Sequence, residues 1–140
     1  MFKKILIAND GSPGGMKALD VAITLAAFTE ASLESISVEE GLPHYAGTID
    51  EVVEVKQQKD AYFAELERRS QKYAQAAEVE LTFTVIPGHK VQTIVDYVKE
   101  GHFDLLIIGF VRHSNVWGRL WGSTSQSLAR LAPCSVLVVK

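Results

Sequence analysis

Short apolar runs alternate along this chain with longer segments in which apolar residues recur every three or four positions. The first pattern is typical of β-strands and the second of amphipathic helices. The clearest strand runs from Leu105 to Ile108, since an unbroken apolar run is typical of a strand that is covered on both faces. The clearest helix lies between Val91 and Val98, where valine and isoleucine occupy positions i, i+3, i+4 and i+7. This alternation is the strongest constraint on the fold.

The same patterns along the whole chain predict an order that begins and ends with a strand. The predicted strands cover residues 5–8, 33–38, 81–85, 105–108 and 136–139, and the predicted helices cover residues 13–26, 52–77, 91–101 and 123–131. Strands that alternate with helices and are apolar along their length form a parallel sheet with helices on both faces. We therefore predict a doubly wound α/β fold in which residues 1–140 form a single domain.

Several predicted helix starts carry residues that cap free backbone amides. Ser12 stands directly before a proline, whose ring already has the φ angle of a helix. Thr48 with Glu51, and Ser123 with Gln126, have the spacing of a capping box. These residues indicate where the helices begin.

The composition excludes several classes of protein. A net charge of -3 gives no general attraction to nucleic acid, and no apolar run approaches the roughly 18 residues that cross a membrane. The only cysteine, Cys134, indicates a reducing compartment because it has no partner for an internal disulfide. We therefore expect a cytoplasmic protein that binds neither nucleic acid nor a membrane.

The C-terminal quarter of the chain differs in charge from the rest. Residues 105–140 contain no aspartate or glutamate and carry the bases Arg112, Arg119, Arg130 and Lys140. A few bases on an otherwise acidic chain are too sparse for a nucleic-acid face, and they indicate a small anion site.

The segment from Gly109 to Gly122 is the best candidate for that site. Strand-to-helix loops in such folds usually run about two to six residues, and much longer ones tend to be functional. Glycine allows the backbone to approach a ligand closely and lets amides point at an oxyanion. Ser123 and Thr124 follow at a predicted helix start, where the helix dipole favours a phosphate.

Each candidate residue also has a purely structural interpretation. Ser123 can cap its helix without touching a ligand, Arg112 can be a solvated surface residue, and His113 favours an anion only through its place in the basic loop. Asp10 follows the first strand, where a carboxylate binds ribose hydroxyls or a cation, or else bonds the amides of the next two residues in a turn.

Motifs for a catalytic site are absent from the sequence. The histidines lack metal-ligand spacing, and no Ser-His-Asp order or pair of catalytic carboxylates is indicated. Neither GxxxxGK[ST] nor a GxGxxG after the first strand occurs. We therefore assign no catalytic residue, and slow ATP hydrolysis is the activity left open.

Several stretches together resemble the universal stress protein family over the whole chain. These are KKILIANDGSPGGMKALDVAITLA at the start, IPGHKVQTIVDYV before and within the third helix, DLLIIGF, and the ending GSTSQSLARLAPCSVLVVK. The resemblance implies a five-stranded parallel sheet in the order 3-2-1-4-5, similar to the adenine nucleotide alpha hydrolases, with Asp10 beside Gly109. It also implies a homodimer that pairs its last strands, here Val136–Val139.

The resemblance further implies an adenine nucleotide site. ATP-binding members carry Gly-x2-Gly-x9-Gly-Ser/Thr, which this chain matches at Gly109, Gly122 and Ser123, with Arg112 in place of the second glycine. The implied ligand is ATP or AMP, with Mg²⁺ only as a companion of the nucleotide at Asp10. The residues expected to contact nucleotide are Ala8, Asp10, Val38, Gly109, Arg112, His113, Gly122, Ser123 and Thr124.

Arg112 leaves two functions open. If a side chain at this position obstructs the ribose and phosphates, the chain is a dimeric protein-interaction module, and Trp117 and Trp121 are candidates for its contacts. If Arg112 turns outward or lays its guanidinium group on the phosphates, the site is retained. We favour a homodimeric stress-response protein that binds an adenine nucleotide, with an unidentified protein partner.

Overall fold

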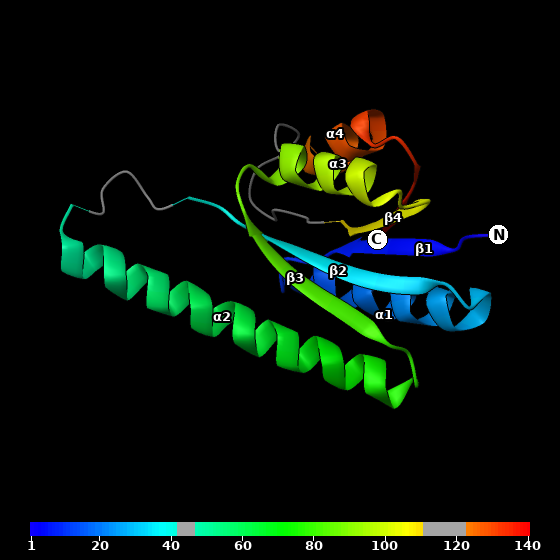
Figure 1. Cartoon of the computed structure of the whole chain (residues 1–140), viewed down its shortest axis with the longest axis horizontal. Coiled ribbons are helices and arrows are strands. Elements are labelled where there is room, and N and C mark those ends of the chain that lie inside the picture. Colours follow the sequence, from blue (N-terminus) through cyan, green and yellow to red (C-terminus); the bar gives the residue numbers. More distant parts are fainter. Residues whose placement is uncertain (42–46, 111–122) are drawn as a thin grey trace.

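The computed structural model describes residues 1–41, 47–110 and 123–140 and contains a five-stranded sheet with helices on both faces (Figure 1). The strands are β1 (Lys4–Ala8), β2 (Ser32–Glu39), β3 (Leu81–Pro87), β4 (Leu105–Gly109) and β5 (Ser135–Val139). The helices are α1 (Pro13–Thr29), α2 (Ile49–Ala76), α3 (Lys90–Gly101) and α4 (Ser123–Leu131). The strand order is β3-β2-β1-β4-β5 and all neighbours are parallel, which confirms the predicted fold class.

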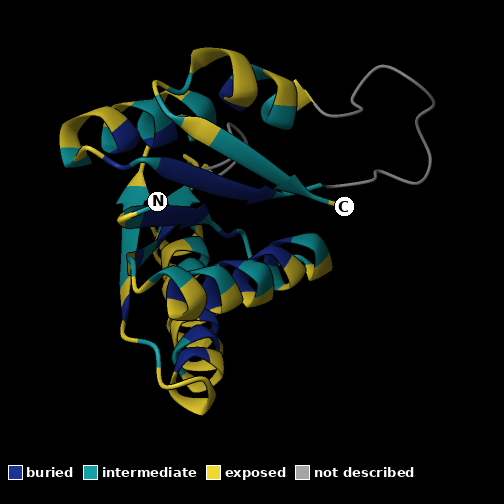
Figure 2. Cartoon of the chain, turned by 90° about the vertical axis from the view of Figure 1, so that its right-hand side faces the viewer, coloured by how far each residue is buried: buried dark blue, intermediate teal, exposed yellow. Residues whose placement is uncertain are grey.

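The two faces of the sheet bury separate apolar clusters because successive side chains of a strand point to opposite faces. In β1, Ile5 and Ile7 pack with residues of α1, whereas Leu6 packs with residues of α3 and α4. Figure 2 shows the central strands buried between helices whose outer sides are exposed. Both layers are therefore needed to cover β1 and β4, as their continuous apolar sequences predicted.

Helix α1 is longer than its pattern predicted, and α2 begins where its predicted cap placed it. Helix α1 continues to Thr29 and ends where Glu30 adopts a left-handed conformation, with its amide bonded to the carbonyl of Ala26. Helix α2 begins at Ile49, directly after Thr48, whose hydroxyl accepts the amide of Glu51 at 3.1 Å. The predicted capping box is only half correct, because the Glu51 carboxylate accepts the amide of residue 47 instead of that of Thr48.

Two serine hydroxyls lie buried in the described residues without a hydrogen-bond partner, those of Ser35 in β2 and Ser70 in α2. Ser37, two residues from Ser35 on the same strand, is equally buried but donates to the carbonyl oxygen of Asn9 at 2.7 Å. A buried hydroxyl without a partner costs free energy, whereas removing a bonded one leaves its acceptor unsatisfied.

Ser35→Ala is therefore expected to leave the free energy of unfolding unchanged or raise it by up to about 1 kcal/mol. Ser37→Ala is the matched control and is expected to lower it by about 1 to 2 kcal/mol. Urea unfolding of both variants measures the difference. Equal destabilisation by the two substitutions would contradict the assignment of Ser35 as an unpartnered hydroxyl.

Candidate functional site

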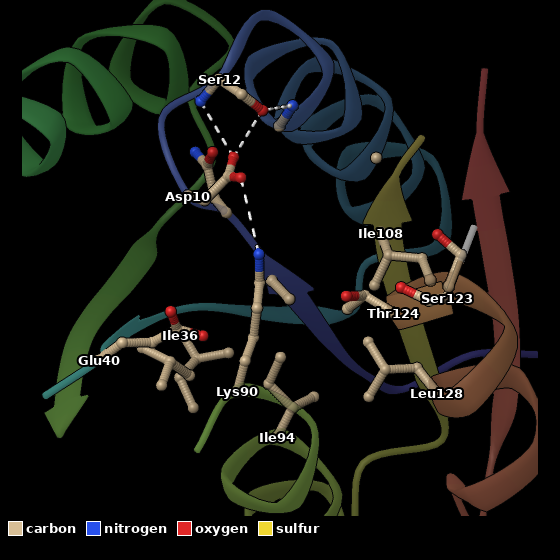
Figure 3. Close-up of a pocket in the computed structure, with 16 residues that line it drawn as sticks. Asp10, Ser12, Ile36, Glu40, Lys90, Ile94, Ile108, Ser123, Thr124 and Leu128 are labelled. Carbon is tan, nitrogen blue, oxygen red and sulfur yellow. Dashed lines mark hydrogen bonds and ion pairs between the residues drawn. The ribbon is translucent and has the colours of Figure 1, made fainter. Parts of the chain in front are cut away.

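A cavity of about 380 Å³ opens at the carboxyl ends of β1, β2 and β4 (Figure 3). In an open α/β sheet, ligands bind at this edge, where the strand order changes direction. Here the change falls between the neighbours β1 and β4, because the chain continues from β1 to β2 and β3 on one side and from β4 to β5 on the other. The cavity therefore lies at the expected place for a ligand site.

The structure brings most of the predicted site residues together in this cavity. Those that line it are Ala8, Asp10, Val38, Gly109, Ser123 and Thr124. The predictions for Arg112, His113 and Gly122, together with those for Arg119, Trp117 and Trp121, lie outside the described residues. The described part of the site thus agrees with the expected grouping of β1, β2, β4 and α4.

A tight turn after β1 positions Asp10. One carboxylate oxygen of Asp10 accepts both the amide of Ser12 at 3.0 Å and its hydroxyl at 2.5 Å. The hydroxyl of Ser12 in turn accepts the amide of Gly15 at 3.1 Å and caps α1, as predicted. Asp10 was also expected to bond the amide of Gly11, but that amide donates to the side chain of Asn9 at 2.9 Å. Asn9 is 2% exposed, so its short side chain is held beside the turn and takes this bond.

Lys90, the first residue of α3, supplies the positive charge nearest to Asp10 among the described residues. Its ammonium nitrogen lies 3.7 Å from the second carboxylate oxygen of Asp10. Burial alone would raise the pKa of Asp10. The hydrogen bonds from Ser12 and the charge of Lys90 lower it by more than burial raises it, so the pKa lies below its ordinary value of 3.8. Asp10 is therefore ionised at neutral pH.

Because the pKa of Asp10 is lowered in the folded state, its ionised form stabilises the fold above the pKa of the unfolded chain, near 4. This contribution is lost as the pH falls through the folded pKa. We expect the stability advantage of the natural protein over Asp10→Asn to shrink between about pH 5 and pH 2. Chemical unfolding across this range measures it, and identical pH profiles for the two proteins would contradict the expectation.

The N-termini of three helices border the cavity. Ser12 and Gly15 belong to the start of α1, Lys90 is the first residue of α3, and Ser123 and Thr124 belong to the start of α4. The first turn of each of these described helices contains no acidic residue. Free amides and the positive ends of helix dipoles attract anions. The cavity therefore offers a favourable environment for a phosphate from several directions.

An apolar wall faces this polar region. It is formed by side chains from β2, α3, β4 and α4, which Figure 3 shows around the cavity: Ile36, Ile94, Ile108 and Leu128, with Val38 also lining it. Small-molecule sites combine such apolar surfaces with a few polar groups that fix orientation. The arrangement fits a flat apolar group joined to an anion.

Gly109 has a packing role that its place in a motif does not reveal. A Cβ atom on Gly109 would lie 2.4 Å from the carbonyl oxygen of Gly14 and 3.0 Å from the amide nitrogen of Gly15. The end of β4 therefore contacts the backbone at the start of α1. This contact holds together two of the elements that border the cavity.

The predicted cap of α4 lies at the border of the described residues. The described part of α4 starts at Ser123, and the residues just before it are not described. Ser123 lines the cavity together with Thr124. Capping of α4 by Ser123 therefore stays a prediction.

Sequence reasoning missed Lys90, Asn9 and Glu40, which also line the cavity. A signal for Lys90 was present, because a helix that starts directly after a parallel strand begins at the same edge of the sheet as the strand ends. For Asn9 the only signal was its place between a buried strand and a turn.

Asp10 was the residue expected to hold Mg²⁺ with a nucleotide, and its surroundings fit this ion poorly. One of its oxygens is engaged by Ser12 and the other faces the ammonium group of Lys90. Within the described residues no group of three His, Cys, Asp or Glu side chains is placed to hold a metal ion.

None of the described helices is long and apolar enough to cross a membrane.

Comparisons with known proteins agree with this fold. The model of the universal stress protein family matches residues 1–140. Universal stress protein YxiE of Bacillus subtilis is 28% identical over 149 residues, which cover 100% of both chains. The structure of universal stress protein UspA from Lactobacillus plantarum has a TM-score of 0.82 and 25% identity, covering 99% of this chain and 98% of that one. A universal stress protein in complex with cAMP has a TM-score of 0.73 and 26% identity, covering 99% and 97%.

Proposed function

Because the chain belongs to the universal stress protein family, we propose that it binds an adenine nucleotide, ATP or AMP, in the cavity at the end of β1 and acts in a stress response. The observation that carries the proposal is the convergence of α1, α3 and α4 on this cavity, opposite an apolar wall. Their N-termini suit phosphate and the wall suits a base. The structural relative in complex with cAMP supports the same class of ligand.

The proposed placement follows from the resemblance to the family and is compatible with the residues that line the cavity. The adenine lies at the end of β2 beside Val38, and the ribose lies near Ala8 and Asp10. The phosphates lie near Gly109 and the first turn of α4, formed by Ser123 and Thr124. The predicted contributions of Arg112, His113 and Gly122 belong to the same proposal.

We further propose that residues 1–140 act as one domain and pair with a second copy through β5. Among the described strands this one lies at the edge of the sheet, and an edge strand can pair with a strand of a partner. Its sequence from Val136 to Val139 is apolar and half-buried. The single cysteine supports the cytoplasm as the location.

Identification of nucleotide released from the gently purified and then denatured protein tests the proposal. Stoichiometric ATP, ADP or AMP, found by mass spectrometry and absorbance, is the expected result, and calorimetric titration with ATP and AMP gives the affinities. A protein that releases no nucleotide and binds neither compound would contradict the proposal. It would favour the dimeric protein-interaction module that Arg112 leaves open.

A further inference from the structure

Lys90 crosses the cavity from the side opposite to α1. Figure 3 shows its side chain reaching from the start of α3 toward Asp10, with Thr124 and Ser123 across the cavity from it. The side chain of Lys90 is 37% exposed and that of Asp10 is 39% exposed, so both remain accessible to a ligand. The ammonium group thus lies between the β1 turn and the space that the phosphates would take.

Lys90 differs in charge from the other ionised side chains that line the described part of the cavity. Among the described residues that line the cavity, the charged side chains are Asp10, Glu40 and Lys90. Lys90 is the cation of this described set, and without it two carboxylates would face an anionic ligand. Lys90 therefore supplies the positive side-chain charge that the described lining offers to a phosphate, in addition to the helix N-termini.

The ion pair with Asp10 leaves Lys90 free to donate. A separation of 3.7 Å is longer than a hydrogen bond, so the charges attract without a shared proton. No hydrogen bond from the Lys90 ammonium group to another described residue is present, and a lysine ammonium group has three donors. Asp10 already receives its hydrogen bonds from Ser12. Lys90 can therefore bond phosphate oxygens while it stays beside Asp10.

The same pair disfavours a divalent cation. An Mg²⁺ ion on the remaining oxygen of Asp10 would lie close to the ammonium group, and like charges repel strongly where water is partly excluded. We propose that Lys90 takes the place of Mg²⁺ as the counter-charge of the nucleotide phosphates, so that this protein binds nucleotide without a divalent cation. This inference rests on the proposed nucleotide site.

Calorimetric titration tests the inference with ATP and with adenosine, which has no phosphate, each in EDTA and in excess Mg²⁺. The variants are Lys90→Gln and, as a matched control, Lys99→Gln, which removes the same charge from the last turn of the same helix. The ATP affinity of the natural protein is expected to be at least as high in EDTA as in excess Mg²⁺, because Mg²⁺ binds ATP in solution and would bring a divalent cation against the Lys90 ammonium group. Lys90→Gln is expected to lower ATP affinity in EDTA by about tenfold or more, since charge-assisted hydrogen bonds are the stronger ones. Added Mg²⁺ should restore part of that loss.

Adenosine affinity should be the same in the natural protein and both variants, and Lys99→Gln should bind ATP normally. Lys90→Gln is also made together with Asp10→Asn and compared with Asp10→Asn alone. This comparison distinguishes a contact of Lys90 with phosphate from an effect of Lys90 on Asp10. If Lys90 contacts phosphate, Lys90→Gln still weakens ATP binding when Asp10 is already replaced.

The inference is overturned if ATP binding by the natural protein needs Mg²⁺, or if Lys90→Gln binds ATP normally in EDTA. It is also overturned if the effect of Lys90→Gln disappears in Asp10→Asn. Each of these results leaves the nucleotide site intact. A natural protein that binds neither ATP nor adenosine would instead overturn the proposed function, and the inference with it.

Discussion

Replacing Gly109 with alanine is expected to lower the free energy of unfolding by about 3 kcal/mol, because the added methyl group overpacks a closed interface. Its Cβ atom would lie 2.4 Å from the carbonyl oxygen of Gly14 and 2.6 Å from its carbonyl carbon. These are backbone atoms at the start of α1, so no side chain can rotate to make room. Relief requires β4 and α1 to move apart.

Chemical denaturation of Gly109→Ala measures this loss. Gly41→Ala is the matched control, because a Cβ atom at Gly41 would have no neighbour within 4 Å, and its unfolding free energy is expected to change by less than about 0.5 kcal/mol. The separation of β4 from α1 should also weaken nucleotide binding, since both elements border the cavity. A Gly109→Ala variant as stable as Gly41→Ala would contradict the packing of β4 on α1.

Thr124→Glu is expected to lower the affinity for ATP about a hundredfold, because a like charge placed against an anion costs several kcal/mol. Thr124 lies in the first turn of α4 and lines the cavity. The same substitution should leave the fold intact or stabilise it by about 0.3 to 1 kcal/mol, because an acidic side chain near a helix N-terminus interacts favourably with the dipole. The predicted changes in binding and in stability therefore have opposite signs.

Two controls separate charge from shape for this variant. Gln126→Glu adds the same charge to the same helix at an exposed position that does not line the cavity, and it should bind ATP almost normally. Thr124→Gln adds bulk without charge and should lose far less affinity than Thr124→Glu. Parallel titrations and thermal unfolding give both readouts. Normal ATP affinity in Thr124→Glu would place the phosphates elsewhere.

The positions of the strands along the chain could be predicted from the sequence because they depend on burial. The unbroken apolar run from Leu105 to Ile108 can be stable only when both faces are covered, and the structure buries all four residues. The order of strands was not accessible from patterns, since hydrophobic periodicity says nothing about which strands are neighbours. That part came from the resemblance to a family, and the structure confirms it.

The site was only partly predictable for a similar reason. Asp10, Ser123 and Thr124 follow a strand or begin a helix, so their edge of the sheet could be inferred. Lys90 reaches the cavity through a long side chain whose direction depends on how α3 packs. Gly109 was interpreted through a ligand motif, whereas its contact with Gly14 depends on the approach of two backbones.

The most direct test of the nucleotide site is a titration of ¹⁵N-labelled protein with AMP, followed by the shifts of assigned backbone amide signals. The largest changes are expected at Asp10, at Ser123 and Thr124, and at the ends of β2 and β4, with little change along the exposed face of α2. Saturating changes confined to these residues would support a nucleotide site at the end of β1. The absence of changes, or changes confined to surfaces away from this cavity, would contradict it.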